Sequence, residues 1–254
     1  MSKSDFFIGW SPDTPRADRR TFLTAGLALT AGAAGGGAWL ASMQNAPGPG
    51  TWNQGDVQEF TGITTAEPYA MLRTLDVDGS PKTVPLACLG KCGVAARIGS
   101  YAGQVVTVKG SLIQRGPYAM IAVIDGMDWI KAAAETVPAN ISFPEITSLG
   151  DISLKGMIVD TKCWFGAMRP SEGKVHKACA SLCIRGGLPP ALLAKDKRGN
   201  QALMIMTNGG GAHGEDLLPL VAEPVKVTVE LKQWGEIYLL DGSVSSIRRL
   251  RRAG

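Results

Sequence analysis

Alternating apolar and polar positions mark the C-terminal part of the chain as β structure. Residues 225–230 alternate cleanly, the turn residues Trp234-Gly235-Glu236 follow, and residues 237–244 return as an apolar run. Alternating runs separated by a glycine turn are typical of two half-buried antiparallel strands. The pattern therefore predicts a β-hairpin, and Ile247 continues its apolar positions.

The same pattern occurs earlier in the chain and indicates a repeat. Residues 105–110 and 118–124 form a second predicted hairpin, around a Gly-Pro turn. Each hairpin has an earlier partner strand that contains a glycine, at residues 60–63 and 154–159. Short antiparallel strands with glycine turns favour small barrels, and the OB-like barrel is the preferred reading over a two-sheet sandwich. The predicted fold class is mainly β, with two small OB-like barrels.

An uncharged apolar run at residues 21–43 precedes the β units. It is long enough to cross a bilayer as a helix. Arg16, Arg19 and Arg20 precede the run and no basic residue directly follows it, which places the N-terminus in the cytoplasm and the β units in the periplasm. The run is expected to be a retained membrane anchor, because no clear small-x-small cleavage site follows it; a cleaved signal peptide is the alternative.

These patterns divide the chain into segments. The second β unit is longer than the first, and the extra length is predicted to be a helical, cysteine-rich insertion at residues 160–190. The predicted segments are a cytoplasmic N-terminal part (1–20), a transmembrane anchor or signal (21–43), a linker (44–58), the first β unit (59–131), a second linker (132–150) and the second β unit (151–254).

Composition and charge narrow the classes of partner. Apolar residues make up 45% of the chain, enough for a buried core, and the formal net charge is only +4. The basic residues gather at 16–20 and 248–252 without interleaved aromatic residues. We therefore expect no nucleic-acid partner.

The five cysteines fall into two groups. Cys88 and Cys92 flank a turn at Gly90, and a local disulfide is the favoured reading; their spacing also resembles that of exported copper-delivery proteins of the Sco type, without the proline that follows the motif there. The odd total leaves one thiol over if the cysteines pair in an oxidising compartment.

The second group lies in the insertion with a histidine. Residues 174–184 have helix-forming composition and stop signals on both sides. On this helix His176, Cys179 and Cys183 share one face, and Cys163, at the end of a strand, could reach it. Three thiols and an imidazole suit a structural zinc site. The same set with the nearby Met168 suits Cu(I).

Other readings of these residues remain open. A disulfide from Cys163 to Cys179 or Cys183 would staple the insertion to the barrel, and small buried thiols are a third possibility. His213, in a glycine-rich loop, is a candidate mobile ligand. Enzymatic chemistry is not favoured, because Asp160 beside Cys163 is the only suggestive pair.

Two resemblances bear on function. Arg19-Arg20-Thr21-Phe22-Leu23 resembles a twin-arginine export signal, whose route carries folded proteins, often with a cofactor installed. The chain is also similar to an uncharacterised family of bacterial membrane-anchored, exported proteins. The motif that carries this likeness consists of Asp160, Cys163, Met168, Pro170, Gly173, His176, Lys177, Cys179, Ala180, Cys183, Ile184, Gly186, Gly187, Pro189 and Pro190.

The family resemblance implies a link to electron transfer, since its members are similar to accessory proteins found alongside membrane redox systems. The first functional hypothesis is a non-enzymatic accessory subunit of a respiratory or other membrane redox complex, with the membrane and the subunits of that complex as partners. The alternative is a periplasmic metal-handling protein that binds copper or zinc through Cys163, His176, Cys179 and Cys183. An enzyme of unknown class is the third hypothesis.

Overall fold

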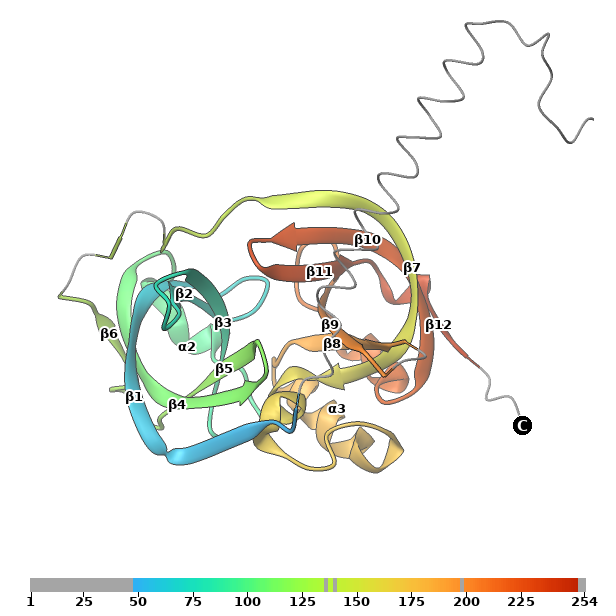
Figure 1. Cartoon of the computed structure of the whole chain (residues 1–254), viewed down its shortest axis with the longest axis horizontal. Coiled ribbons are helices and arrows are strands. Elements are labelled where there is room, and N and C mark those ends of the chain that lie inside the picture. The colour runs from blue at the N-terminus through green and yellow to red at the C-terminus, as the bar shows by residue number, and fades with distance from the viewer. Residues whose placement is uncertain (1–47, 135–136, 139–140, 197–198, 251–254) are drawn as a thin grey trace, which may run out of the picture. The chain divides into compact units, whose positions relative to one another are not determined.

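Two closed five-stranded barrels follow one another along the chain (Figure 1). The computed structural model describes residues 48–134, 137–138, 141–196 and 199–250. Residues 45–254 form one compact unit, which contains both barrels. The mainly β fold with two small barrels is therefore confirmed.

The first barrel has one parallel contact among its neighbouring strands. Its order is β1-β2-β3-β5-β4, and β4 closes it onto β1. β3 and β5 run parallel, while the other neighbours are antiparallel. The short helices α2 (Ala95–Ile98) and η1 (Gly99–Tyr101) connect β3 to β4. The strands are β1 (Thr51–Thr65), β2 (Met71–Leu75), β3 (Pro81–Ala87), β4 (Val105–Arg115), β5 (Tyr118–Val123) and an edge strand, β6 (Ile130–Ala132).

The second barrel repeats this topology strand for strand. Its order is β7-β8-β9-β11-β10, closed by β10 onto β7, and the parallel contact is between β9 and β11. The 3-10 helix η5 (Glu215–Leu220) occupies the place of α2, and η6 (Val244–Ser246) precedes the last strand. The strands are β7 (Ile146–Asp160), β8 (Pro190–Lys195), β9 (Gln201–Thr207), β10 (Pro224–Trp234), β11 (Ile237–Asp241) and β12 (Ile247–Arg249).

Equivalent glycines lie where the first strand of each barrel, its opening strand, changes from one neighbouring strand to another. β1 pairs first with β4 and then with β2, and β7 pairs in the same way with β10 and then with β8. A Cβ on Gly62 would overlap the carbonyl oxygen of Arg73, and one on Gly156 would crowd that of Leu193. Glycine is therefore required for the close approach of the backbones at both positions.

The opening strands are longer than the sequence pattern indicates. β1 begins at Thr51, inside the linker expected at 44–58, and β7 begins at Ile146, inside the one expected at 132–150. Both extensions are largely exposed, so they lack the alternating apolar positions by which a strand is recognised. They are held by pairing to β4 and β10 instead.

The cysteine-rich insertion lies between β7 and β8. It contains the π-helical turn η3 (Cys163–Ala167), the 3-10 turn η4 (Lys174–His176) and α3 (Lys177–Arg185). The helix expected over 174–184 is confirmed, with its first turn tightened to 3-10 geometry.

A shared apolar core joins the two barrels through the insertion. Trp164 is fully buried in it and packs edge-on against Tyr118 of β5, with ring centroids 5.2 Å apart. Tyr69 donates a hydrogen bond from its hydroxyl to the carbonyl oxygen of Met206 at 2.8 Å. The buried members of this core are Ala87, Ile113, Met120, Ala122, Val159, Cys163, Trp164, Phe165, Cys183, Leu188, Ala191, Leu193 and Leu203.

The N-terminal part of the chain lies outside these described residues. The cytoplasmic segment expected at 1–20 and the anchor or signal expected at 21–43 both fall there. Within the described ranges, no helix combines the length and the apolarity that a membrane crossing needs.

Candidate metal centre

Three cysteines of the second barrel bring their sulfurs together. The three Sγ atoms of Cys163, Cys179 and Cys183 all lie within 4.8 Å of one another, and the first two are 3.8 Å apart. All three are free thiols; Cys163 and Cys183 are buried and Cys179 is partly exposed. Because soft thiolates bind copper and zinc, the cluster is a candidate metal centre.

Local geometry explains how the sequence forms this cluster. Cys179 and Cys183 are four residues apart on α3, so they lie one turn apart on the same helix face. Cys163 opens η3 directly after β7 ends at Asp160. The Asp160 Oδ1 atom accepts a hydrogen bond from the Cys163 backbone N–H at 2.8 Å, which fixes the start of this turn.

His176 lies at the border of the cluster rather than among the three sulfurs. Its Nε2 atom pairs with Asp160 Oδ2 at 2.9 Å, and both side chains are almost fully buried. Ligand atoms of Asp160, Cys163 and His176 lie within 4.8 Å of one another, so the histidine is near Cys163 but is not grouped with Cys179 and Cys183. Its other ring nitrogen, Nδ1, is not held by Asp160, so ligation through Nδ1 would keep this pair, as is usual for metal-ligating histidines, but would require the ring to approach Cys179 and Cys183.

A fourth sulfur lies on the exposed side of the cluster. The Cys179 thiol donates to the Met168 thioether, with 3.5 Å between the sulfurs. Met168 is 40% exposed, so its flexible side chain is free to adjust its distance to the three thiols. Thioethers and thiolates together are a typical donor set for Cu(I).

Neighbouring thiols and burial disfavour negative charge on Cys163. A hydrogen bond with Cys183, followed by burial, raises the pKa of Cys163 well above its ordinary value. The thiol is therefore protonated at neutral pH while the site holds no metal. Metal binding would displace this proton, as it does from any ligating cysteine.

Two lysines place positive charge beside the thiols. Lys91, from the first barrel, donates from Nζ to the Cys179 sulfur at 2.7 Å, and this contact raises the pKa of Lys91. Lys162 is adjacent to Cys163 and only 2% exposed. Burial lowers the pKa of Lys162 to about 8, and the neighbouring Cys183 and Cys163 oppose the shift. Both side chains are therefore ammonium groups at pH 7.

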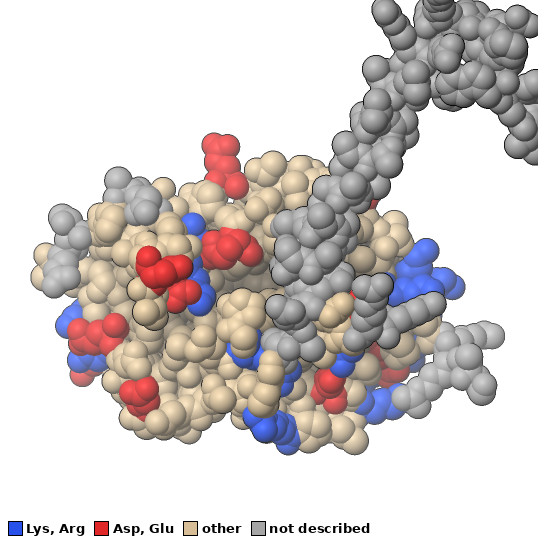
Figure 2. All heavy atoms as spheres, in the orientation of Figure 1, with Lys and Arg blue, Asp and Glu red and all other residues tan. Residues whose placement is uncertain are grey.

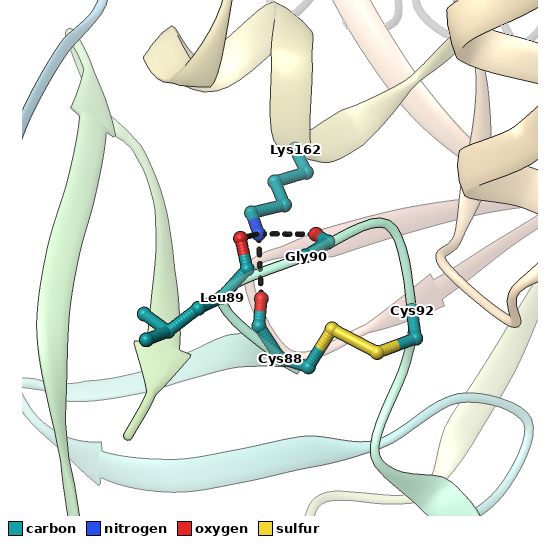
Figure 3. Close-up of a disulfide and its surroundings, with 5 residues drawn as sticks. All are labelled: Cys88, Leu89, Gly90, Cys92 and Lys162. Carbon is teal, nitrogen blue, oxygen red and sulfur yellow. Dashed lines mark hydrogen bonds between the residues drawn. A yellow bond between two sulfur atoms is a disulfide. The ribbon is translucent and has the colours of Figure 1, made fainter. Parts of the chain in front are cut away.

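A ring of backbone carbonyls holds the Lys162 ammonium (Figure 3). Its Nζ donates to the carbonyl oxygens of Cys88, Leu89 and Gly90, at 2.5, 2.8 and 2.7 Å. The Trp52 ring lies on another side, with its centroid 5.1 Å from Nζ. Three acceptors match the three donors of an ammonium, which allows a charged group to be buried here.

A disulfide closes the loop that supplies these carbonyls. Cys88 and Cys92 are bonded, with their Cα atoms 5.4 Å apart, so the local disulfide around Gly90 is confirmed. The disulfide fixes the backbone of the loop that both cages Lys162 and carries Lys91 (Figure 3). The first barrel therefore contributes directly to the surroundings of the second barrel's thiols.

Replacing Lys162 by Met is expected to lower the free energy of unfolding by about 2–3 kcal/mol. Methionine fills a similar volume but leaves the three carbonyl oxygens without their donor. Urea denaturation at pH 7 measures the change. The exposed Lys155→Met on β7 is the matched control, expected to stay within about 0.5 kcal/mol of the wild type. A Lys162→Met variant as stable as this control would contradict the structural role of the ammonium.

His213 is buried away from the thiols. Its backbone N–H donates to the Tyr69 hydroxyl at 3.1 Å. Burial lowers the pKa of His213 below its ordinary 6.5, against the opposing effect of Asp216 and Asp241. It belongs to neither of the potential ligand groups found among the described residues, so its role as a mobile ligand stays a prediction.

The lowered pKa of His213 predicts a loss of stability in weak acid. The unfolded chain takes up a proton near pH 6.5 and the folded chain only at lower pH, so stability is complete above pH 6.5 and falls as the pH drops through the folded pKa. His213→Gln is expected to remove this loss below pH 6.5. The measurement is urea denaturation of both proteins at a series of pH values. Parallel curves for the two proteins over this range would contradict it.

Some members of this site carry no recognisable sequence signal. Lys91 and Lys162 are ordinary lysines in the sequence, and their contacts join residues 88 and 72–74 positions apart. Asp160 could be singled out in the sequence by its position three residues before Cys163. Its pairing with His176 is seen only in the folded structure.

No family model, no curated protein and no solved structure matches the chain.

Proposed function

We propose that this chain is an exported, membrane-anchored accessory protein of a membrane redox system, and that it contributes a soft-metal site for copper or zinc. The observation that carries the metal proposal is the approach of the Cys163, Cys179 and Cys183 sulfurs to within 4.8 Å. Three converging thiols, two of them buried, suit a soft cation far better than any hard one.

The two candidate metals use different donors. Zinc would take the three thiolates with His176 as the fourth ligand, through the ring nitrogen that Asp160 does not hold. Copper in its monovalent state would take the thiolates alone or with Met168. In either case the ligands lose protons on binding, and the protein supplies largely buried thiols next to two ammonium groups.

The finer fold assignment and the location are part of this proposal. Both barrels are assigned to the OB type, supported by the order 1-2-3-5-4-1 and by the helix between the third strand and the fourth. Residues 21–43 are assigned as the anchor, with residues 1–20 in the cytoplasm and the barrels in the periplasm. The twin-arginine-like segment and the family resemblance support this, and imply the membrane and redox-complex subunits as partners.

Metal content and free thiols test the chemical part of the proposal. The full-length chain is exported by its native route, extracted in detergent without chelators and analysed by elemental mass spectrometry. We expect close to one copper or zinc per chain, together with three thiols that become reactive only after metal removal. A metal-free protein with a single reactive thiol would contradict the metal site, because two of the three cysteines would then form a disulfide staple.

Membrane extraction tests the accessory role. The chain is expected to stay with the membrane fraction in high salt, because an apolar anchor resists salt extraction. After mild detergent extraction it is expected to migrate with a redox complex that contains haem, iron–sulfur or molybdopterin centres. Release by salt would contradict the anchor, and migration apart from every such complex would contradict the accessory role.

A further inference from the structure

We infer that the centre formed by Cys163, Cys179 and Cys183 is selective for monovalent copper over zinc, and that Lys91 of the first barrel is a determinant of this selectivity. The inference rests on the proposed metal site and names its metal. It combines the number of available donors, the charge around them and the way the first barrel covers the thiols.

The donor set is short of what zinc requires. Structural zinc sites are almost always four-coordinate. The cluster provides three thiols, and the nearby His176 is grouped with Asp160 and Cys163 but not with Cys179 and Cys183. Monovalent copper is satisfied by a few soft sulfur ligands, and the Met168 thioether adjoins Cys179 at 3.5 Å. Copper can therefore be held by sulfur alone, with no movement of His176 toward Cys179 and Cys183.

The charges beside the thiols favour the monovalent ion. The Lys91 ammonium lies 2.7 Å from the Cys179 sulfur, and the buried Lys162 directly precedes Cys163 in the chain. Two ammonium groups repel an incoming divalent cation twice as strongly as a monovalent one.

Lys91 lies against the most exposed thiol of the centre. Its ammonium lies 2.7 Å from the Cys179 sulfur, the most exposed of the three, and an ammonium cannot ligate a metal. The loop that carries Lys91 is held against the end of α3. The Gly93 N–H donates to the Gly186 carbonyl at 2.8 Å, and a Cβ on Gly186 would overlap the carbonyl oxygen of Lys91.

Competition between the two metals tests the inference on the full-length chain in detergent under anaerobic conditions. Cu(I) is supplied from a colorimetric Cu(I) chelator and Zn²⁺ from a fluorescent zinc chelator, so that both dissociation constants are measured. We expect one Cu(I) per chain that a tenfold excess of Zn²⁺ does not displace. X-ray absorption at the copper edge should show sulfur neighbours only. Displacement by zinc, or a nitrogen neighbour on copper, would overturn the inference while the proposed metal site stands.

Binding of neither metal would instead overturn the proposed function itself. This outcome is distinct from zinc preference, because it is seen in both titrations at once. A thiol count on the same sample shows whether the cysteines were reduced during the titration. Only titrations of protein with three reactive thiols are used for the comparison.

A charge reversal tests the part assigned to Lys91. In Lys91→Glu, the ratio of Cu(I) affinity to Zn²⁺ affinity is expected to fall at least about tenfold, in the range found for groups that adjoin metal ligands. The milder Lys91→Gln should shift the ratio in the same direction. It serves as a second variant in case Lys91→Glu does not fold. Lys155→Glu, the same change at an exposed site on β7, should leave the ratio within about twofold. An unchanged ratio in both Lys91 variants would overturn the assignment.

Discussion

The Cys183→Ser variant of the full-length chain is expected to bind Cu(I) at least about a hundredfold more weakly than the wild type. Groups that only adjoin metal ligands already account for 10–100-fold effects, and the loss of a direct sulfur donor should exceed them. Cys183 is the most buried of the three thiols, at 1% exposure, so solvent does not replace it easily. Competition against a colorimetric Cu(I) chelator measures the change.

Ser181→Ala is the matched control for this variant. Ser181 lies on the same helix, two residues away and on a different face, so its replacement should change the Cu(I) affinity by less than about twofold. Equal Cu(I) affinity in Cys183→Ser and Ser181→Ala would show that copper binds elsewhere. Circular dichroism of both variants confirms that α3 and the barrels are retained before the affinities are compared.

Replacing Trp164 by Ala is expected to lower the free energy of unfolding by about 3–5 kcal/mol. Trp164 is fully buried between the barrels, where it packs against Tyr118 at 5.2 Å and lies 4.6 Å below the Arg115 guanidinium. Alanine would leave a cavity that neither barrel can fill alone, because its walls belong to both. Urea denaturation measures the change, with Met127→Ala as the control at a residue that is 90% exposed.

The shared core is also expected to determine the number of unfolding transitions. Each barrel has part of its apolar surface covered by the other, so the wild type is expected to unfold in one transition seen equally by tryptophan fluorescence and circular dichroism. Trp164→Ala should weaken this coupling. Two well-separated transitions in the wild type, or a Trp164→Ala variant as stable as Met127→Ala, would show that the barrels fold independently.

The repeat was predictable because the sequences of β4 and β10 alternate, at least in part, between apolar and polar residues. Residues 225–230 fall in β10, where buried and less buried positions alternate; residues 105–110 fall in β4, where only Val105 and Lys109 are not buried. The early parts of β1 and β7 escaped prediction for the converse reason. They are exposed, and pairing with a neighbour gives no periodic signal in the strand's own sequence.

The candidate site was predictable in its chemistry and less so in its geometry. Helical spacing correctly placed Cys179 and Cys183 on one face, since that depends only on local periodicity. The same argument put His176 with them, but His176 precedes α3, in the 3-10 turn η4, and its ring points to Asp160 on the end of β7. The contacts of Lys91 and Lys162 depend on how two barrels dock, which no local pattern encodes.

Charge elsewhere on the molecule is mixed in sign. On the face seen in Figure 2, acidic and basic side chains are interspersed among a larger area of uncharged residues. Screening in physiological salt limits exposed charges to a range of about 8 Å. The electrostatics of the thiol cluster are therefore set by its immediate neighbours, above all by Lys91 and Lys162.

The short span of the Cys88–Cys92 bond has a consequence for oxidative maturation. These cysteines are four positions apart, whereas 16 positions separate Cys163 from Cys179. The entropy lost on closing a loop grows with its length, so the local pair forms a disulfide before more distant thiols meet. Two of the five cysteines can then no longer form wrong disulfides, and the remaining three can pair only with one another. Early closure of this small loop thus keeps Cys88 and Cys92 out of exchange with the three thiols of the candidate metal centre.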